Sequence, residues 1–273
     1  MYALYKERYN VTKNKIGIIQ SRGIGDLVIA LPIAKYYYDD GYEVFWPICE
    51  PFMSSMVPAA PWVNWISVPV DPQGRFFYET PNRKLREVGI TEKDQLWLYQ
   101  YLNSHPDKTN KSLFAQMKFD QYKYAAVGLP FSLKWTLDKC ITRNPVREQS
   151  LYNRVVKQER YMIYQNHASD MSYDIDLSVI DPEVQRIEIT ELTDSIFDWL
   201  KIIEGAETII LIDSVFANLI DQLQIAEDAD KYYMRKWNRR VDGNPVLLGA
   251  WTFVDVEEPD NTQVKSLADT GLK

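Results

Sequence analysis

The stretch KIGIIQSRGIGDLVIALP, residues 15–32, decides the fold. Its first six residues form a short, mostly apolar run that predicts a buried strand. Gly23 and Gly25 follow and let the backbone turn sharply and approach a ligand. From Asp26 to Tyr38 the apolar residues recur at helical spacing, although Pro32 predicts a kink or a late start. The stretch therefore predicts a strand, a glycine turn and a helix with a carboxylate at its beginning.

The same alternation of strands and helices continues along the chain. Further strands are expected at Tyr42–Pro47, Trp65–Val70, Lys123–Pro130, Arg160–Gln165, Gln185–Ile189 and Thr208–Asp213. Helices are expected at 195–204 and 214–223, and this order is typical of parallel α/β units. The pattern restarts after the charged residues 143–158, which we interpret as a linker. We therefore expect an α/β protein of two Rossmann-like domains facing each other across a cleft, residues 1–150 and 151–273.

The composition is that of a soluble globular protein, with 46% hydrophobic and 25% charged residues among 273. The net charge of -7 argues against a general nucleic-acid coat, because phosphate binding needs clustered positive charge. Two cysteines far apart in sequence, Cys49 and Cys140, form neither a metal pattern nor a disulfide scaffold. No run of about 18 apolar residues predicts a membrane span. We expect a cytoplasmic protein.

Asp26 stands directly after the glycine turn, and two roles are open for it. As a helix cap, its side chain would accept hydrogen bonds from free backbone N–H groups. As a general base facing a cleft, it would remove a proton from a hydroxyl. Two nucleotide-binding alternatives fit poorly, because a dinucleotide fingerprint needs glycine where Val28 stands and a P-loop needs Gly-Lys-Ser/Thr.

A second loop, Asp213-Ser214-Val215-Phe216-Ala217-Asn218, follows the most apolar strand in the second half. It places an acid at a strand end and a hydroxyl ahead of a helix. Helix N-termini attract phosphate groups, so this loop is a candidate phosphate site. The simpler interpretation is that Asp213 or Ser214 caps the helix. Ligands of open α/β sheets lie beyond the carboxyl ends of strands, where both loops are expected.

The two loops together resemble those of the family 9 glycosyltransferases, the ADP-heptose heptosyltransferases, which have the GT-B fold. The first motif stands as Arg22-Gly23-Ile24-Gly25-Asp26 with Pro32 after it. The resemblance implies that Asp26 is the catalytic base, and that Arg22, Gly23 and Gly25 lie against the acceptor and sugar. A virus-encoded, DNA-modifying relative of these enzymes is a further expectation.

The second motif of that family reads Asp-Thr-Gly-x-x-His and cradles the diphosphate of the nucleotide sugar. Here Asp213, Ser214, Val215 and Asn218 stand at its positions, with valine for glycine and asparagine for histidine. The resemblance implies that these residues bind the donor. It also implies an inverting, metal-independent sugar transfer that uses a nucleotide sugar as co-substrate and no cofactor.

Two further features of the sequence are candidates for parts of a site. His167 follows the strand at 160–165, and is either a donor-facing residue or an ordinary loop histidine. Asp174-Ile175-Asp176 is a D-x-D, the metal-binding signature of the other glycosyltransferase fold. So short a pattern is frequent by chance, and we expect no metal there.

Residues 231–240 interleave cations with aromatic rings. Lys231, Arg235 and Arg239 are candidate contacts to an anionic partner, either donor phosphates or a nucleic-acid backbone. A solvated helix face is the simpler interpretation. The expected acceptor is a surface glycan or a hydroxymethylated DNA base, the latter in a host cytoplasm if the protein is viral.

Two other classes of function stay open. A nucleotide-dependent oxidoreductase of the Rossmann type is disfavoured by Val28, which stands where the fingerprint needs glycine. A non-catalytic binding module would tolerate the loss of Asp26. The sugar, the nucleotide and the acceptor are not specified by the sequence.

Overall fold

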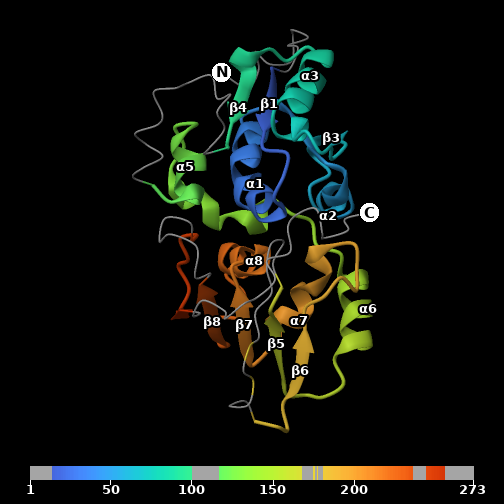
Figure 1. Cartoon of the computed structure of the whole chain (residues 1–273), viewed down its shortest axis with the longest axis vertical. Coiled ribbons are helices and arrows are strands. Elements are labelled where there is room, and N and C mark those ends of the chain that lie inside the picture. The colour runs from blue at the N-terminus through green and yellow to red at the C-terminus, as the bar shows by residue number, and fades with distance from the viewer. Residues whose placement is uncertain are drawn as a thin grey trace, which may run out of the picture.

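The computed structural model describes residues 14–99, 117–167, 175, 177, 181–235 and 244–255. These residues form two parallel sheets with helices around them, one sheet in each half of the chain (Figure 1). The N-terminal half lies above the C-terminal half in this view, with α1 and α8 at the junction. The expected α/β class with two Rossmann-like halves is confirmed.

The N-terminal sheet has the order β3-β2-β1-β4, and its described strands are all parallel. Gly17 of β1 pairs with Phe45 on one side and with Gln95 on the other. The strands are β1 (Lys15–Ile19), β2 (Glu43–Cys49), β3 (Asn64–Val68) and β4 (Gln95–Trp97). Because β1 is central, the loop that follows it lies in the middle of the carboxyl edge of the sheet.

Three helices of the N-terminal half follow strands or connect them. They are α1 (Ile24–Asp39), α2 (Met53–Ala59) and α3 (Glu79–Glu87), with the short turns η1 (Glu50–Phe52), η2 (Arg75–Phe77) and η3 (Glu92–Asp94) between. Residues 27–34 of α1 are all buried, which is typical of a helix covered on every side. The helix continues through Pro32 without a break, so the expected late start is wrong.

The C-terminal sheet has the order β6-β5-β7-β8-β9 and is also parallel in its described strands. Its elements are β5 (Tyr161–Gln165), β6 (Gln185–Glu188), η7 (Ile196–Trp199), α7 (Leu200–Glu204), β7 (Thr208–Ile212), α8 (Val215–Leu223), β8 (Asp230–Arg235) and β9 (Trp251–Asp255). The central strand β7 is almost wholly buried and leads directly into α8. The arrangement repeats that of β1 and α1.

The connecting region contains α5 (Phe119–Ala125), η5 (Phe131–Trp135), η6 (Leu137–Lys139) and α6 (Pro145–Val155). The strand expected at 123–130 is wrong. Gly128 ends α5 with a φ of 69°, and the N–H of Leu129 donates back to the carbonyl of Tyr124 at 3.0 Å. That helix-ending hydrogen bond explains why an apolar, glycine-containing run is not a strand.

The residues interpreted as a linker, 143–158, form a helix over most of their length. The Asn144 side chain accepts from the N–H of Arg147 at 3.1 Å, and Pro145 occupies the first helical position. Asparagine followed by proline is therefore a helix start here, not a loop signal. The expected division between residues 150 and 151 falls inside α6 and stays a prediction.

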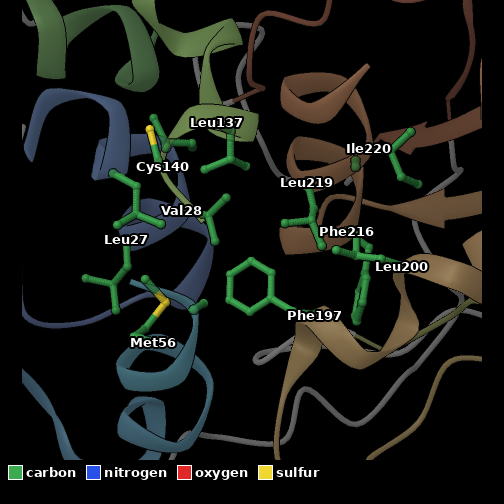
Figure 2. Packing of buried hydrophobic residues seen from close by; sticks show 14 of the residues in the cluster. Leu27, Val28, Met56, Leu137, Cys140, Phe197, Leu200, Phe216, Leu219 and Ile220 are labelled. Carbon is green, nitrogen blue, oxygen red and sulfur yellow. The ribbon is translucent and has the colours of Figure 1, made fainter. Parts of the chain in front are cut away.

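One cluster of buried apolar side chains runs through both halves. Figure 2 shows Val28 of α1 and Leu137 of η6 close to Phe197, Phe216 and Leu219 of the C-terminal half. The two sheets thus share a core where α1 packs on α8. This packing fixes the start of one helix relative to the start of the other.

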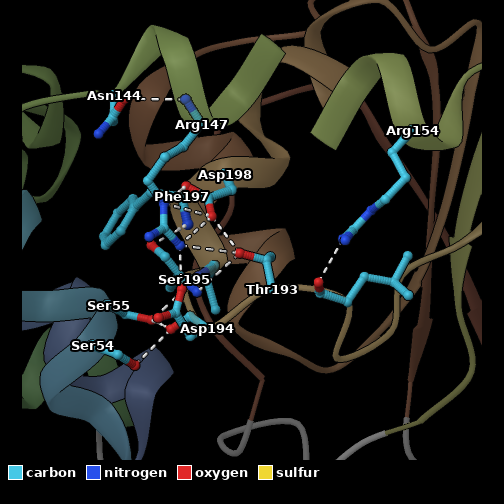
Figure 3. A network of polar contacts seen from close by, with 12 residues as sticks. Ser54, Ser55, Asn144, Arg147, Arg154, Thr193, Asp194, Ser195, Phe197 and Asp198 are labelled. Atoms are coloured by element: carbon cyan, nitrogen blue, oxygen red, sulfur yellow. Dashed lines mark hydrogen bonds and ion pairs between the residues drawn. The ribbon is translucent and has the colours of Figure 1, made fainter. Parts of the chain in front are cut away.

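A polar network borders this shared core (Figure 3). Arg147 of α6 pairs with Asp198 of η7 at 2.7 Å and also pairs with Asp194. Ser54 at the start of α2 donates to the backbone carbonyl of Asp194 at 2.6 Å, and Ser55 donates to the same carbonyl at 3.2 Å. The network thus connects the N-terminal half with the C-terminal half beside the apolar core.

In the part of the chain that the structure describes, no helix has both the length and the apolar character needed to cross a membrane. The expected cytoplasmic location stays a prediction.

Candidate functional site

The first loop leaves β1 at Gln20 and enters α1 through Gly23. Gly23 has a φ of 83°, a left-handed conformation that side chains disfavour. A Cβ atom on this residue would also collide with Oδ2 of Asp26. Glycine is therefore required at position 23 for two reasons. The turn needs a positive φ, and the Asp26 carboxylate occupies the space that a side chain would fill.

The backbone of this loop is fixed by Tyr99. The N–H groups of Ser21 and Arg22 both donate to the Tyr99 hydroxyl, at 2.9 and 2.8 Å. Burial raises the pKa of Tyr99 above its ordinary value, so the hydroxyl stays protonated at neutral pH. With these two amides already engaged, the loop is not built as a phosphate cradle.

Asp26 is not a helix cap. Gly23 occupies the N-cap position of α1, and no side-chain cap hydrogen bond is present there. The Asp26 carboxylate instead pairs through Oδ1 with the ammonium of Lys123 at 2.8 Å. About a third of the Asp26 side chain is exposed, against 3% of the Lys123 side chain. The Asp26 carboxylate is therefore partly exposed, while the cation that pairs with it is buried.

Lys123 is a site residue that sequence reasoning missed. It was expected on a strand, whereas α5 directs its side chain into the carboxyl edge of the N-terminal sheet. Nothing in the sequence around it resembles a known motif. The signal was only a charged residue among buried aromatic neighbours, Tyr122 and Tyr124.

Arg22 is part of the same loop. Its guanidinium lies 5.0 Å from the centroid of the Phe76 ring, within the range of a cation–π contact. The structure places Arg22, Gly23, Gly25 and Asp26 together at the carboxyl end of β1, as expected. Their contact with an acceptor or sugar stays a prediction.

The second loop lies at the carboxyl end of β7. Asp213 is buried, Ser214 occupies the N-cap position of α8, and Val215 begins the helix. Among the described residues other than glycine, only Gln224 and Ala226 have a positive φ. Val215 stands where the Asp-Thr-Gly-x-x-His motif of the family 9 glycosyltransferases has glycine, and its backbone is not strained.

Buried polar atoms without hydrogen-bond partners in the described residues gather around this loop. They include Oγ of Ser214, Oδ1 of Asn218, Oε1 of Gln165 and Oδ1 of Asn166. Gln165 pairs in register with Leu211, so its neighbour Asn166 and Asp213 follow their strands at the same edge. Because buried polar groups normally find partners, this edge has the character of a ligand site. Gln165 and Asn166 were not singled out from the sequence.

The two loops meet across the junction of the halves. A Cβ atom built on Gly25 would lie 3.6 Å from Cα of Val215 and 3.9 Å from its backbone nitrogen. The first turn of α1 and the first turn of α8 therefore lie close together, with room for about one methyl group between Gly25 and Val215. Residues separated by 190 positions in sequence form one site.

His167 lies at the β6 side of the same sheet edge. Its side chain is 60% exposed, and Nδ1 lies 3.3 Å from Oε1 of Glu188. The structure gives His167 this acidic neighbour from β6. Its role as a donor-facing residue stays a prediction.

The basic-aromatic segment differs from its expected form. Residues 230–235 are the strand β8, so the solvated helix face is wrong for them. Lys231 is buried, and its ammonium donates to the carbonyls of Ala226 at 2.7 Å and Glu227 at 3.3 Å. Its contact with an anionic partner stays a prediction, which this burial disfavours. Arg235 packs its guanidinium over the Phe253 ring, 4.7 Å from the centroid.

Several expected features fall outside the described residues. These are Arg239 and both carboxylates of the D-x-D, Asp174 and Asp176. Within the described ranges, no group of three or more His, Cys, Asp or Glu residues has the geometry to hold a metal ion.

The arrangement was compared with known proteins. No protein-family model and no curated protein sequence matches the chain. A family 9 glycosyltransferase from Veillonella parvula has a similar structure, with a TM-score of 0.55 over 89% of this chain and 86% of that one. The chain has the GT-B fold. At 10% sequence identity, the likeness concerns the fold alone.

Two weaker likenesses carry no part of this assignment. E. coli heptosyltransferase WaaC with ADP has a TM-score of 0.46 at 10% identity, over 89% of this chain and 91% of that one. E. coli ADP-heptose lps heptosyltransferase II has a TM-score of 0.46 at 12% identity, over 94% of each chain.

Proposed function

We propose that this GT-B protein is a glycosyltransferase that moves a sugar from a nucleotide sugar to an acceptor hydroxyl with inversion. The observation that carries the proposal is the contact between Gly25 and Val215. It brings an accessible carboxylate from one half beside a helix start and buried polar atoms from the other half. An inverting transferase needs both components within one site.

Asp26 is the proposed general base. The acceptor O–H gives its proton to the carboxylate while the acceptor oxygen forms a bond to the anomeric carbon. The bond from that carbon to the phosphate oxygen breaks, and the nucleoside diphosphate leaves with the electron pair. Asp26 is deprotonated before the step and carries one proton after it.

The start of α8 is the proposed donor site. Its free N–H groups and its dipole favour the negative diphosphate, which gains charge as the bond breaks. Ser214 and Asn218 offer buried polar atoms for further hydrogen bonds, and Asp213 lies beside them. In this assignment protein groups stabilise the departing diphosphate, as the resemblance to the metal-independent family 9 enzymes implies.

The acceptor is a hydroxyl on a glycan or on a hydroxymethylated DNA base. The burial of Lys231 removes one of the three cations that favoured DNA. Among the described residues, Arg235 is the remaining candidate for a contact with the DNA backbone. Charge reversal at Arg235 should weaken binding of hydroxymethylated DNA and flatten its salt dependence, whereas glycan transfer should not change.

The proposal is tested with a panel of ADP-, UDP-, GDP- and dTDP-sugars. A true donor should raise the melting temperature of the protein, because ligand that binds only the folded state stabilises it. That donor is then incubated with lipopolysaccharide core oligosaccharide or with hydroxymethylated DNA, and the product is identified by mass spectrometry. The absence of stabilisation and of transfer with every donor would overturn the proposal.

A further inference from the structure

We propose that Lys123 is the positioning residue for Asp26, and that its ammonium orients the carboxylate for proton removal. The inference rests on the proposed function, because it assigns Lys123 a part in the same reaction. Lys123 touches neither the sugar nor the acceptor in this assignment. It acts only through Asp26.

The Lys123 ammonium is held by three acceptors. Its nitrogen lies 2.8 Å from Oδ1 of Asp26, 2.7 Å from Oε1 of Gln20 and 3.2 Å from the carbonyl oxygen of Leu98. Gln20 and Leu98 accept hydrogen bonds from the ammonium, and Asp26 forms an ion pair with it. Gln20 follows β1 and Leu98 follows β4, which makes the support part of the sheet edge and not of a mobile loop.

Gln20 is itself held in place. Its side-chain amide donates to the carbonyl of Arg22 at 2.8 Å, and its backbone carbonyl accepts from the Trp46 indole at 2.7 Å. The ammonium is therefore aimed at one point within the loop. A single ion pair on the surface would lack this direction.

The two oxygens of Asp26 have different surroundings. Oδ1 is bound by Lys123, whereas Oδ2 lies where a side chain on Gly23 would stand. With Oδ1 held by Lys123 and Oδ2 lying over Gly23, which has no side chain, the carboxylate has a defined orientation. General base catalysis depends on this orientation, and displacement by about 1 Å costs on the order of 10²-fold in rate.

A purely structural role explains less. Burying a lysine is costly, and another buried lysine of the chain forms an ion pair whose carboxylate does not reach solvent. Lys134 lies 2.8 Å from Asp120, and both side chains are fully buried. The Lys123 pair differs because its carboxylate reaches solvent at the junction of the two loops. The two pairs provide a matched comparison.

The experiment is a double-mutant cycle on donor turnover. Lys123→Met, Asp26→Asn and the double variant are compared with the parent in single-turnover transfer, using the nucleotide sugar that stabilises the parent most. Lys123→Met should lower the rate on the order of 10²-fold and leave the donor Kd within about twofold. In the Asp26→Asn background, Lys123→Met should lower the residual rate no further.

Lys134→Met is the control for a buried ion pair away from the site. It should lower the melting temperature without a comparable loss of rate per folded molecule. Should Lys123→Met fold poorly, Lys123→Gln keeps one N–H donor toward Oδ1 and is expected to retain an intermediate rate. The double variant removes both partners at once, which is milder for folding than removing either one.

The outcomes separate the two proposals. Parent-like turnover in folded Lys123→Met or Lys123→Gln, or an equal fall in the Asp26→Asn background, would overturn the role of Lys123 and leave the transferase intact. The absence of turnover in the parent with every donor would overturn the proposed function and the inference together.

Discussion

Gly25 and Val215 pack against each other at the starts of two helices that belong to different halves of the chain. A single methyl group on Gly25 would lie at an ordinary van der Waals distance from Val215. This packing determines how near the carboxylate of Asp26 lies to the opening of α8.

Gly25→Ala should fold as well as the parent or slightly better, because its Cβ would lie at an ordinary distance from Val215 and alanine favours helices. Gly25→Phe should cost about 1–3 kcal/mol, since it overpacks the junction. It should also reduce donor-dependent stabilisation. Urea unfolding with and without donor measures both effects. Equal behaviour of the alanine and phenylalanine variants would contradict the contact.

Asp26→Asn should lower the rate of sugar transfer by about 10²–10⁴-fold, the usual worth of a general base. The substitution also removes the charge that pairs with Lys123, while Lys123 remains buried. We therefore expect a loss of about 1–3 kcal/mol in the free energy of unfolding. Parent-like transfer by a folded variant would exclude Asp26 as the base.

Asn218→Ala should weaken donor binding about 3–10-fold, the effect of one lost hydrogen bond. The free protein should lose little stability, because the described residues make no hydrogen bond to Oδ1 of Asn218. Calorimetric titration and a melting curve give the two quantities. Ser54→Ala serves as the control, since it removes a hydrogen bond to the carbonyl of Asp194 far from the donor. Loss of stability without loss of affinity would make Asn218 a packing residue.

The two buried thiols predict a pH dependence of stability. Burial raises the pKa of Cys49 from about 9 to about 11 and that of Cys140 to about 12. Between pH 9 and 11 the unfolded chain loses thiol protons that the folded chain keeps, so stability falls as pH rises. Below pH 9 the thiols contribute no slope.

Urea unfolding at pH 8 and pH 10 tests this expectation. Each thiol contributes at most about 1.4 kcal/mol per pH unit. Cys49→Ala should therefore show a shallower decline than the parent, while buried tyrosines contribute equally to both. An unchanged slope in Cys49→Ala would mean that this thiol is not protected by the fold.

The sequence predicted the strands and helices that carry both loops, because β1 and β7 are short apolar runs, each followed by turn residues and then by the longer apolar segment of α1 or α8. It failed where local signals compete. Residues 123–130 were expected to form a strand but contain the end of α5 and Gly128. Residues 143–158 were interpreted as a linker, but Asn144 caps the helix α6 there. Both errors concern helix-terminal residues, whose meaning depends on the neighbouring backbone hydrogen bonds.

Within the site, Asp26 was found because it stands in a motif. Lys123 was not found, because its partners Gln20 and Leu98 are 103 and 25 positions away. Lys231 was misjudged for a related reason: a lysine among tyrosines reads as an exposed cation, yet backbone carbonyls of the preceding loop bind it inside. Sequence spacing does not reveal which cations are buried.

The apolar cluster shared by the two halves has a consequence for how the chain can be divided. Cutting between the sheets would expose Val28 on one fragment and Leu219 on the other to water. Neither fragment should then be stable alone, and heating the intact chain should give one calorimetric transition rather than two. Two fragments produced together should instead associate through this apolar surface. The fold would then tolerate the loss of one peptide bond between the halves, but not the loss of the apolar contact.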